Sequence, residues 1–259
     1  MEGEYSKMAG HEFYKAHGQD WDIKKVFLNG GHQSPINLQQ GPKGAASLDV
    51  RYGPEKVGHL INNKHTWELH YHDDYGGTLF FGDRMFTLVQ FHFHAPSEHT
   101  VEGVDFSPNY PEGHYSMEVH LVHSDIRPWD KEIEKTGKHL AVIAVMFIEG
   151  TANPFLAKFW KVMPRHQEEK PSPNLSLDAE ALLPKNRAYQ TYIGSLTTPP
   201  CSDQVTWIVL TEPIEASKNQ IDQFRKNMQE LAGADNYRAV QTNKPNVRHS
   251  PRGAAVFGK

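Results

Sequence analysis

Two short runs that alternate apolar and polar residues, with histidines on the polar face, constrain this chain more than any other feature. In Gln90–His94 and Glu118–His123 the period of two is typical of β-strands. His92 and His94 share one face of the first run, and His120 lies in the second. If the two strands are neighbours, three imidazoles can converge on one point. Three imidazoles with an open fourth position are typical of a catalytic Zn²⁺ site.

The alternative is that these histidines are ordinary surface or core residues, because 16 histidines in 259 residues give some pairs at this spacing by chance. Gln90 and Glu118 favour the metal site, since each precedes a histidine by two residues and shares its face. A buried amide or carboxylate needs a partner, and a metal-bound imidazole needs one on its second ring nitrogen. We therefore predict that Gln90 holds His92 and that Glu118 holds His120.

Further motifs, spread over most of the chain, carry a resemblance to a known family. They are, in order, Gln33-Ser34-Pro35-Ile36-Asn37, Gln90-Phe91-His92-Phe93-His94, Ser97-Glu98-His99-Thr100-Val101, Met117–His123, Gly194–Cys201 and Val205–Val209. In their order and spacing the chain resembles the α-class carbonic anhydrases from about Tyr14 to Arg238. The resemblance implies a zinc enzyme that hydrates carbon dioxide reversibly to bicarbonate and a proton by zinc-hydroxide attack. It also implies inhibition by sulfonamides, a part in pH regulation and a weak esterase side activity.

Short strand-like runs dominate between Leu48 and Val209, whereas helical patterns are sparse. One helix is predicted after Asn153-Pro154, with asparagine as N-cap, and another after Ser217, which has a capping-box partner in Gln220. The pattern alone predicts a β-dominated α+β fold. The resemblance adds a large, twisted, mostly antiparallel central sheet with short surface helices and zinc at the base of a conical cavity.

Composition and charge limit the domain organisation and the classes of partner. No linker or internal repeat divides the chain, so we expect 1–259 to form a single domain, with 1–12 as a flexible N-terminal extension. The formal net charge of −4 gives no reason to propose nucleic acid or an anionic membrane as partner. The longest apolar run, Leu140–Ile148, is too short to span a bilayer and indicates a buried strand. Pro164–Pro173 is predicted to be a surface loop.

The resemblance implies roles for residues beyond the three ligands. The hydroxyl of Thr197 would donate to the carboxylate of Glu98 and so orient the zinc hydroxide. Thr198 would lie where substrate or an anion binds, and a backbone carbonyl near Asn236 would hold His94. A small apolar wall for carbon dioxide would consist of Val122, Val142, Leu196, Val205 and Trp207. Without the resemblance, Thr-Thr-Pro-Pro indicates an ordinary turn, and the apolar residues indicate plain core packing.

His65 matches the proton shuttle of the family. Imidazole suits that role because its unperturbed pKa lies near neutrality. His59, His70 and His72 lie close to it in sequence, and the pattern alone cannot choose among the four. The preceding Lys64 stands where many members have a small residue, so we expect its charge to shift the pKa or the orientation of the shuttle.

The single cysteine and the polar N-terminus bear on assembly and compartment. Secreted members pair the cysteine at the position of Cys201 with one five residues before Gln-Ser-Pro, where this chain has Leu28, so that disulfide is excluded. Cys201 is then a buried thiol or a bridge between two chains, and both monomer and dimer stay open. Met1–Gly10 lacks the apolar core of a signal peptide. We expect a secreted or periplasmic chain whose signal has been removed, and the alternative is a cytoplasmic chain.

Two alternatives of other classes stay under consideration. Some relatives keep the fold, lack a zinc histidine and act as catalytically silent binding modules, whereas all three histidines are present here. A cupin-like metal oxygenase would also use three histidines, but Ser-Leu-Thr-Thr-Pro-Pro and Gln-Ser-Pro do not belong to that class. The expected partners are therefore Zn²⁺, carbon dioxide and bicarbonate. Metal content measured together with carbon dioxide hydration separates the three hypotheses.

Overall fold

The computed structural model describes residues 13–21, 32–39, 42–101, 111–128, 137–242 and 245–250. Its strands are β1 (Asn37–Leu38), β2 (Leu48–Arg51), β3 (Pro54–Asn62), β4 (Trp67–Tyr71), β5 (Thr78–Phe81), β6 (Arg84–His94), β7 (Thr100–Val101), β8 (Met117–Ser124), β9 (Leu140–Glu149), β10 (Glu168–Pro171), β11 (Ser176–Asp178), β12 (Tyr189–Ser195), β13 (Asp203–Leu210), β14 (Ile214–Ala216) and β15 (Arg248–His249). Its helices are α2 (Pro154–Val162), α3 (Lys218–Ala232) and the short 3-10 helices η2 (His72–Asp74) and η3 (Ala179–Leu182). The predicted extension 1–12 and position 28 lie outside the described residues.

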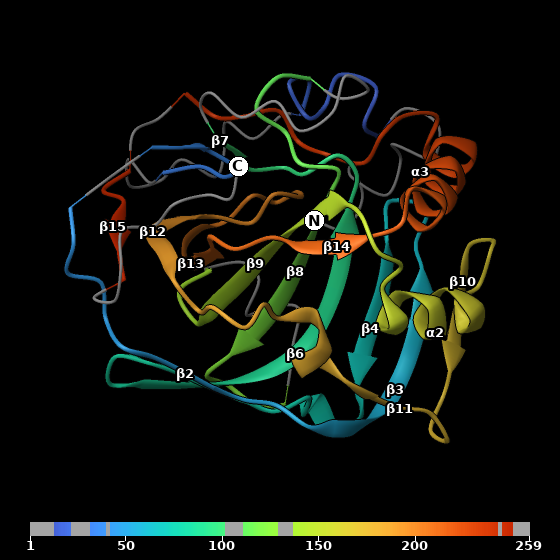
Figure 1. The fold of residues 1–259 in the computed structure, drawn as a ribbon, viewed down its shortest axis with the longest axis horizontal. Helices are drawn as coiled ribbons and strands as arrows, with labels where there is room; N and C mark the ends of the chain where they lie inside the picture. Colours follow the sequence, from blue (N-terminus) through green and yellow to red (C-terminus); the bar gives the residue numbers. More distant parts are fainter. Residues whose placement is uncertain are drawn as a thin grey trace.

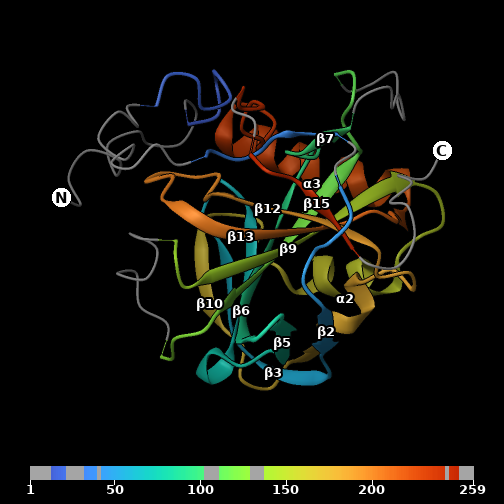
Figure 2. The same ribbon diagram turned by 90° about the vertical axis from the view of Figure 1, so that its left-hand side faces the viewer.

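One large sheet dominates the described part of the chain (Figure 1). It has thirteen strands there, and its main path runs β10-β3-β4-β6-β8-β9-β13-β12-β15. β13 and β14 run parallel to β9, while the other pairs of this sheet are antiparallel. From the side the strands cross at changing angles, as in a twisted sheet (Figure 2). The prediction of a large, mostly antiparallel sheet is confirmed.

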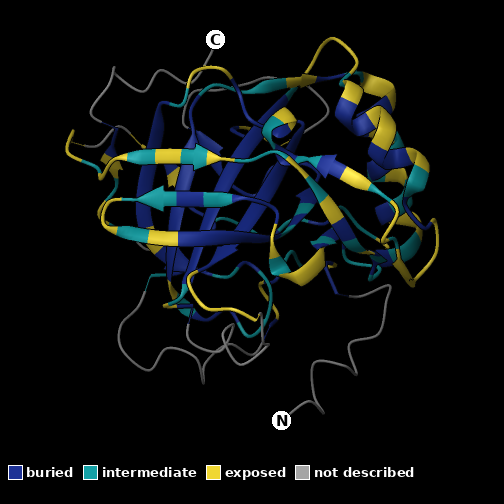
Figure 3. Cartoon of the chain, turned by 90° about the horizontal axis from the view of Figure 1, so that it is seen from below, coloured by how far each residue is buried: buried dark blue, intermediate teal, exposed yellow. Residues whose placement is uncertain are grey.

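The two faces of the central strands pack against different partners. Phe91 and Phe93 of β6 point into a core cluster that also contains Phe159 of α2 and Phe224 of α3. The opposite face carries the histidines and a second apolar cluster that includes Trp207. Figure 3 shows the middle of the sheet buried, with exposed residues concentrated on outer strands and helices. The phenylalanines thus fix which face of β6 turns away from the core, because a slip of one residue would bury the histidines among them.

Both predicted helices are present, with the predicted N-caps. The side chain of Asn153 accepts hydrogen bonds from the backbone N–H groups of Phe155 and Leu156 before α2. Ser217 and Gln220 form a capping box at the start of α3. Each helix turns its apolar side chains into the core cluster, so both stabilise the fold by packing rather than by carrying the site.

Pro164–Pro173, which follows α2 and was predicted to be a surface loop, is only partly a loop. It contains β10, which pairs in antiparallel fashion with β3 at one end of the main path of the sheet. All four residues of β10 are exposed, so they carry no apolar alternation that would predict a strand, and charged residues ending in proline are usual on edge strands.

Leu140–Ile148 lies within the buried strand β9, as predicted. None of the described helices combines the length and the apolar character needed to cross a membrane.

Candidate metal centre and active site

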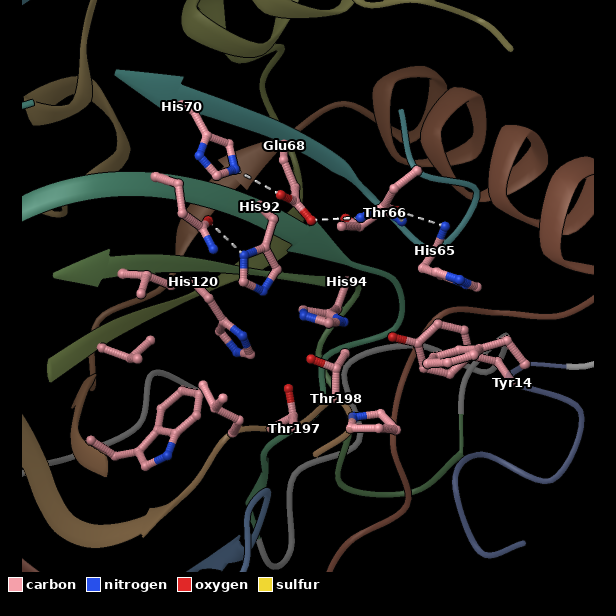
Figure 4. Close-up of a pocket in the computed structure, with 18 residues that line it drawn as sticks. Tyr14, His65, Thr66, Glu68, His70, His92, His94, His120, Thr197 and Thr198 are labelled. Carbon is pink, nitrogen blue, oxygen red and sulfur yellow. Dashed lines mark hydrogen bonds and ion pairs between the residues drawn. The ribbon is translucent and has the colours of Figure 1, made fainter. Parts of the chain in front are cut away.

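The three predicted ligands lie side by side on β6 and β8. His92 pairs directly with His120 across the two strands, and His94 follows two residues later on the same face of β6. The ring centroids lie 5.2 Å apart for His92 and His120, 5.1 Å for His92 and His94, and 4.6 Å for His94 and His120. Figure 4 shows the three rings at the centre of a pocket. Their ligand atoms lie within 4.8 Å of one another, so one ion can bridge them.

The proton positions on the three rings fit a metal. Each ring has one nitrogen bonded to an oxygen acceptor: His92 Nδ1 to Gln90 Oε1 at 2.9 Å, His94 Nδ1 to the carbonyl of Asn236 at 2.7 Å, and His120 Nε2 to Glu118 Oε1 at 2.9 Å. The bonded nitrogen therefore carries the proton, and the other nitrogen keeps its lone pair. In His94 that other nitrogen, Nε2, is buried without a hydrogen-bond partner among the described residues. A buried unpaired acceptor is costly, and Zn²⁺ would satisfy it.

The three imidazoles are neutral at pH 7. Burial lowers the pKa of each ring, to about 4 for His94. The pKa of His92 falls well below its usual value through burial and through the neighbouring His94 and His120. Burial also lowers the pKa of His120, against the opposing effect of Glu118. Neutral rings are the form that binds a metal, and they leave the full charge of a divalent ion uncompensated by its ligands.

Glu118 is a fully buried carboxylate that holds the ring of His120. Burial alone would raise its pKa, but His99 and His120 outweigh that effect and hold the pKa well below its usual value. Its Oε1 also contacts His99 Nδ1 at 2.7 Å, and its Oε2 accepts from the backbone N–H groups of Glu98 and His99 at 2.7 and 2.9 Å. These bonds stabilise the ionised form in the interior.

The Gln-Ser-Pro motif takes part in the same network, a link that the sequence alone does not reveal. Ser34 Oγ lies 2.8 Å from the hydroxyl of Tyr192, and that hydroxyl lies 2.7 Å from His99 Nε2. A side chain at Gly194 would place its Cβ 2.2 Å from Ser34 Oγ. Glycine is therefore required there for β12 to approach Ser34 and complete the chain of hydrogen bonds to Glu118.

A buried arginine joins three further segments behind the site. Arg238 Nη1 donates to Gln33 Oε1 at 3.0 Å and to the carbonyl of Ser34 at 2.6 Å. Gln33 Nε2 donates to the carbonyl of Cys201 at 2.9 Å, and the backbone N–H of Arg238 donates to Glu98 Oε1 at 2.8 Å. This network fixes the loop that follows Thr197 relative to the carboxylate of Glu98.

Glu98 lies fully buried behind the metal ligands. Its Oε1 is 3.4 Å from His94 Nδ1. Burial raises the pKa of Glu98 to about 7, although His120, the hydroxyl of Thr197 and the backbone N–H of Arg238 lower it in part. Oε2 has no hydrogen-bond partner among the described residues, so it is a buried acceptor towards which the Thr197 hydroxyl can turn.

A cavity of about 300 Å³ opens in front of the three ligands. The predicted residues that line it are Gln90, His65, Val122, Val142, Leu196, Thr197, Thr198 and Trp207. Val205 is fully buried in the adjacent apolar cluster and is not among the lining residues. Glu98, Glu118 and Asn236 lie behind the wall, fully buried. The structure therefore brings the predicted site together, with Val205 as a supporting rather than a lining residue.

His65 lies at the cavity wall against two aromatic residues of the N-terminal segment. Its ring centroid is 3.9 Å from that of Phe13 and 6.2 Å from that of Tyr14. Burial lowers the pKa of His65 to about 4, Glu68 opposes the shift, and Lys64 lowers the pKa further. Lys64 adopts a φ of 71°, a left-handed conformation that suits a small residue such as glycine better.

Glu68 also lines the cavity, together with Asn63 and Phe13, and sequence reasoning missed these three as site residues. His70, one of the four histidines among which the pattern could not choose, lines the cavity as well. A signal was present, because Trp67, Leu69 and Tyr71 alternate with the two polar residues. That alternation predicts a polar face, but only the pairing of Glu68 with His92 places this face at the metal centre.

Cys201 is fully buried and packs with Phe13, Tyr14 and Trp21. Burial raises the pKa of its thiol to about 11. We therefore expect a thiol-specific reagent to leave the native protein unlabelled at pH 8 and to find one thiol per chain in denaturant. A covalent dimer on a non-reducing gel after oxidation of native protein would contradict this and favour the bridge between chains.

Comparisons with known proteins agree with this geometry. The sequence profile of the family described as eukaryotic-type carbonic anhydrase matches residues 16–251. The carbonic anhydrase of Klebsiella pneumoniae is 38% identical over 240 residues, covering 90% of this chain and 88% of the relative. That of Neisseria gonorrhoeae is 34% identical over 233 residues, covering 90% and 82%. Among solved structures, the α-carbonic anhydrase of Thermovibrio ammonificans with the inhibitor sulfanilamide has a TM-score of 0.73 at 35% identity, covering 93% of this chain and 99% of the other.

Proposed function

This chain belongs to the eukaryotic-type carbonic anhydrase family, and on that basis we propose how its residues hydrate carbon dioxide reversibly to bicarbonate and a proton. It is a zinc carbonic anhydrase with the metal triad His92, His94 and His120. The observation that carries this conclusion is the convergence of three neutral imidazoles with their lone pairs available. The single sheet that supplies all three ligands supports treating the chain as one domain that serves one site.

The chemistry depends on the ion that the triad would hold. Zn²⁺ bound there would act as a Lewis acid and lower the pKa of a water molecule to about 7. The three rings contribute by staying neutral, because neutral ligands would not reduce the positive charge of the zinc ion that acts on the water molecule. Gln90, Glu118 and the carbonyl of Asn236 hold the rings in the orientation that binding requires.

Thr197 and Glu98 orient the attacking oxygen. A threonine hydroxyl that donates to the Glu98 carboxylate can only accept a hydrogen bond from the nucleophile. This fixes the direction of the remaining lone pair of the nucleophile towards the substrate. The buried Oε2 of Glu98, which has no hydrogen-bond partner among the described residues, supports the assignment, as does the effect of Thr197, which lowers the pKa of Glu98 in part.

The substrate needs an apolar surface next to this nucleophile, because carbon dioxide makes few hydrogen bonds. Val122, Val142, Leu196 and Trp207 line the cavity, and Val205 supports them from the apolar cluster. Thr198 adds a polar group at the rim for bicarbonate or an inhibitory anion. We propose no nucleic-acid partner, in keeping with the net charge of −4.

One experiment separates the proposed activity from a silent binding module. The purified protein should contain one zinc per chain by elemental analysis, and the zinc should be required for carbon dioxide hydration in a stopped-flow assay. Sulfanilamide should inhibit by competing with hydroxide, since a structurally similar relative is solved with that inhibitor. A fully zinc-loaded chain that did not hydrate carbon dioxide would be a binding module.

We propose His65 as a proton shuttle and expect His65→Ala to lower the maximal rate in weak buffer by about two- to tenfold. The catalytic efficiency for carbon dioxide should stay nearly unchanged, because proton release follows the chemical step. Imidazole buffer should restore the rate, since a mobile base replaces the tethered one. An unchanged maximal rate in weak buffer would show that another group moves the proton.

A further inference from the structure

A polar track runs along the cavity wall from His70 through Glu68 towards the backbone of His65 (Figure 4). Nε2 of His70 lies 3.0 Å from Oε2 of Glu68, and Oε1 of Glu68 accepts from Asn63 Nδ2 at 2.6 Å. All three of these residues line the cavity. On β6 the strand partner of His70 is Gln90 rather than a metal ligand. His70 is therefore an imidazole in the cavity that is anchored by a carboxylate and takes no part in the metal triad.

The track continues over the neighbouring strands to the surface. His70 pairs with His59 of β3, and side chains of directly paired residues lie on the same face with Cβ atoms about 5 Å apart. Nδ1 of His59 lies 2.6 Å from Oε1 of Glu169 on the edge strand β10. The exposed fraction of the side chains rises from 19% at Glu68 and 26% at His70 to 46% at His59 and 58% at Glu169. A row of ionisable groups thus connects the cavity with solvent.

His65 has a low proton affinity in its position against Phe13. Its pKa of about 4 makes transfer from a donor of pKa near 7 unfavourable by about a thousandfold. A second acceptor with better access to solvent would relieve this restriction on proton release.

We propose that His70 is a second proton acceptor of the cavity, working in parallel with His65 and passing protons through His59 to solvent. The inference rests on the proposed function, because hydration of carbon dioxide produces the proton. An O–H bond of a cavity water breaks while an N–H bond forms on the ring of His70. Transfer of a ring proton to His59 or to buffer restores the neutral imidazole.

The groups that face His70 act in opposite directions. Glu68 on β4 places a carboxylate against His70, and Glu169 on β10 places one against His59. His59 on β3 and the metal ligand His92 on β6 disfavour a second positive charge nearby, and His70 in turn lowers the pKa of His92. The acidic groups lie on the path towards solvent, so they favour movement of the proton away from the metal centre.

The test uses the zinc-loaded full chain in the stopped-flow assay at low buffer concentration. His65→Ala is expected to remove half or more of the maximal rate, so His70→Ala should lower that rate by up to about twofold without changing kcat/KM, and imidazole buffer should restore it. Rates of parallel routes add, so His65→Ala/His70→Ala should lose more than the product of the two single losses. A merely structural role of His70 would give losses that multiply and that imidazole does not restore.

His72→Ala is the matched control, because His72 follows β4 directly, pairs with Asp73 at 3.1 Å and is not among the cavity-lining residues. It should keep the parent rate. With an active parent, three outcomes would each overturn the inference. The first is an unchanged maximal rate for His70→Ala in weak buffer. The others are a double variant whose loss equals the product of the single losses, and a loss that imidazole fails to restore. A zinc-loaded parent without hydration activity would instead overturn the proposed function, and this inference with it.

Discussion

His94→Ala is expected to abolish tight zinc binding and to lower kcat/KM for carbon dioxide hydration by at least about a thousandfold. The ring supplies the buried, unpartnered Nε2 of the triad, and its removal leaves two protein ligands where a catalytic zinc needs three. The backbone carbonyl of Asn236 would also lose its donor. Zinc content by elemental analysis and hydration by stopped flow on the same sample measure both effects.

His123→Ala provides a control for the loss of a buried imidazole as such. His123 lies three residues beyond His120 on β8, where it bonds the hydroxyl of Tyr52 and the carbonyl of Ala141 rather than the metal triad. Its removal should lower the free energy of unfolding while zinc content and kcat/KM stay close to the parent. A zinc-free His94→Ala protein that hydrated carbon dioxide at the parent rate would refute the assignment of the metal centre.

Local patterns in the sequence predicted the elements that depend on few residues. The alternation in β6 and β8 predicted the strands and the shared face of His92 and His94. The caps Asn153 and Ser217 predicted where the two helices begin. The prediction that Gln90 and Glu118 share faces with ligands also follows from local geometry, because side chains two residues apart in a strand point the same way.

Contacts between distant segments could not be predicted from local patterns. The hydrogen bonds that join Ser34 through Tyr192 and His99 to Glu118 span the chain, and they depend on strand register. Arg238 is fully buried although arginine is rarely buried, and only its partners Gln33 and Ser34 explain this. The prediction that the backbone near Asn236 holds His94 came from family resemblance alone.

The histidines near the cavity wall are a second case in which local patterns could not predict the environment of each residue. His59, His65, His70 and His72 lie within one short segment, and the sequence could not distinguish them. The structure separates them by pairing and burial: His65 is packed on Phe13, His70 lines the cavity, and His59 and His72 reach solvent. Strand pairing and the position of the N-terminal aromatic residues decide these environments.

Thr197→Ala is expected to lower kcat/KM by roughly ten- to a thousandfold and to weaken sulfonamide binding. Thr197 is buried at the cavity wall, and the buried Oε2 of Glu98, which has no hydrogen-bond partner among the described residues, is the acceptor that we propose for its hydroxyl. Without the hydroxyl, the nucleophile loses the acceptor that orients it, and Glu98 keeps a buried oxygen without a donor. Stopped-flow kinetics and a sulfanilamide titration of the zinc-loaded variant measure the two losses.

Thr197→Ser is the matched control because it keeps the hydroxyl and removes only a methyl group. We expect it to retain kcat/KM within about tenfold of the parent, with zinc content equal in all three proteins. Equal losses in Thr197→Ala and Thr197→Ser would assign the effect to packing of the Thr197 side chain. Unchanged kinetics in Thr197→Ala would exclude the proposed hydrogen bond between Thr197 and Glu98 as a determinant of the rate.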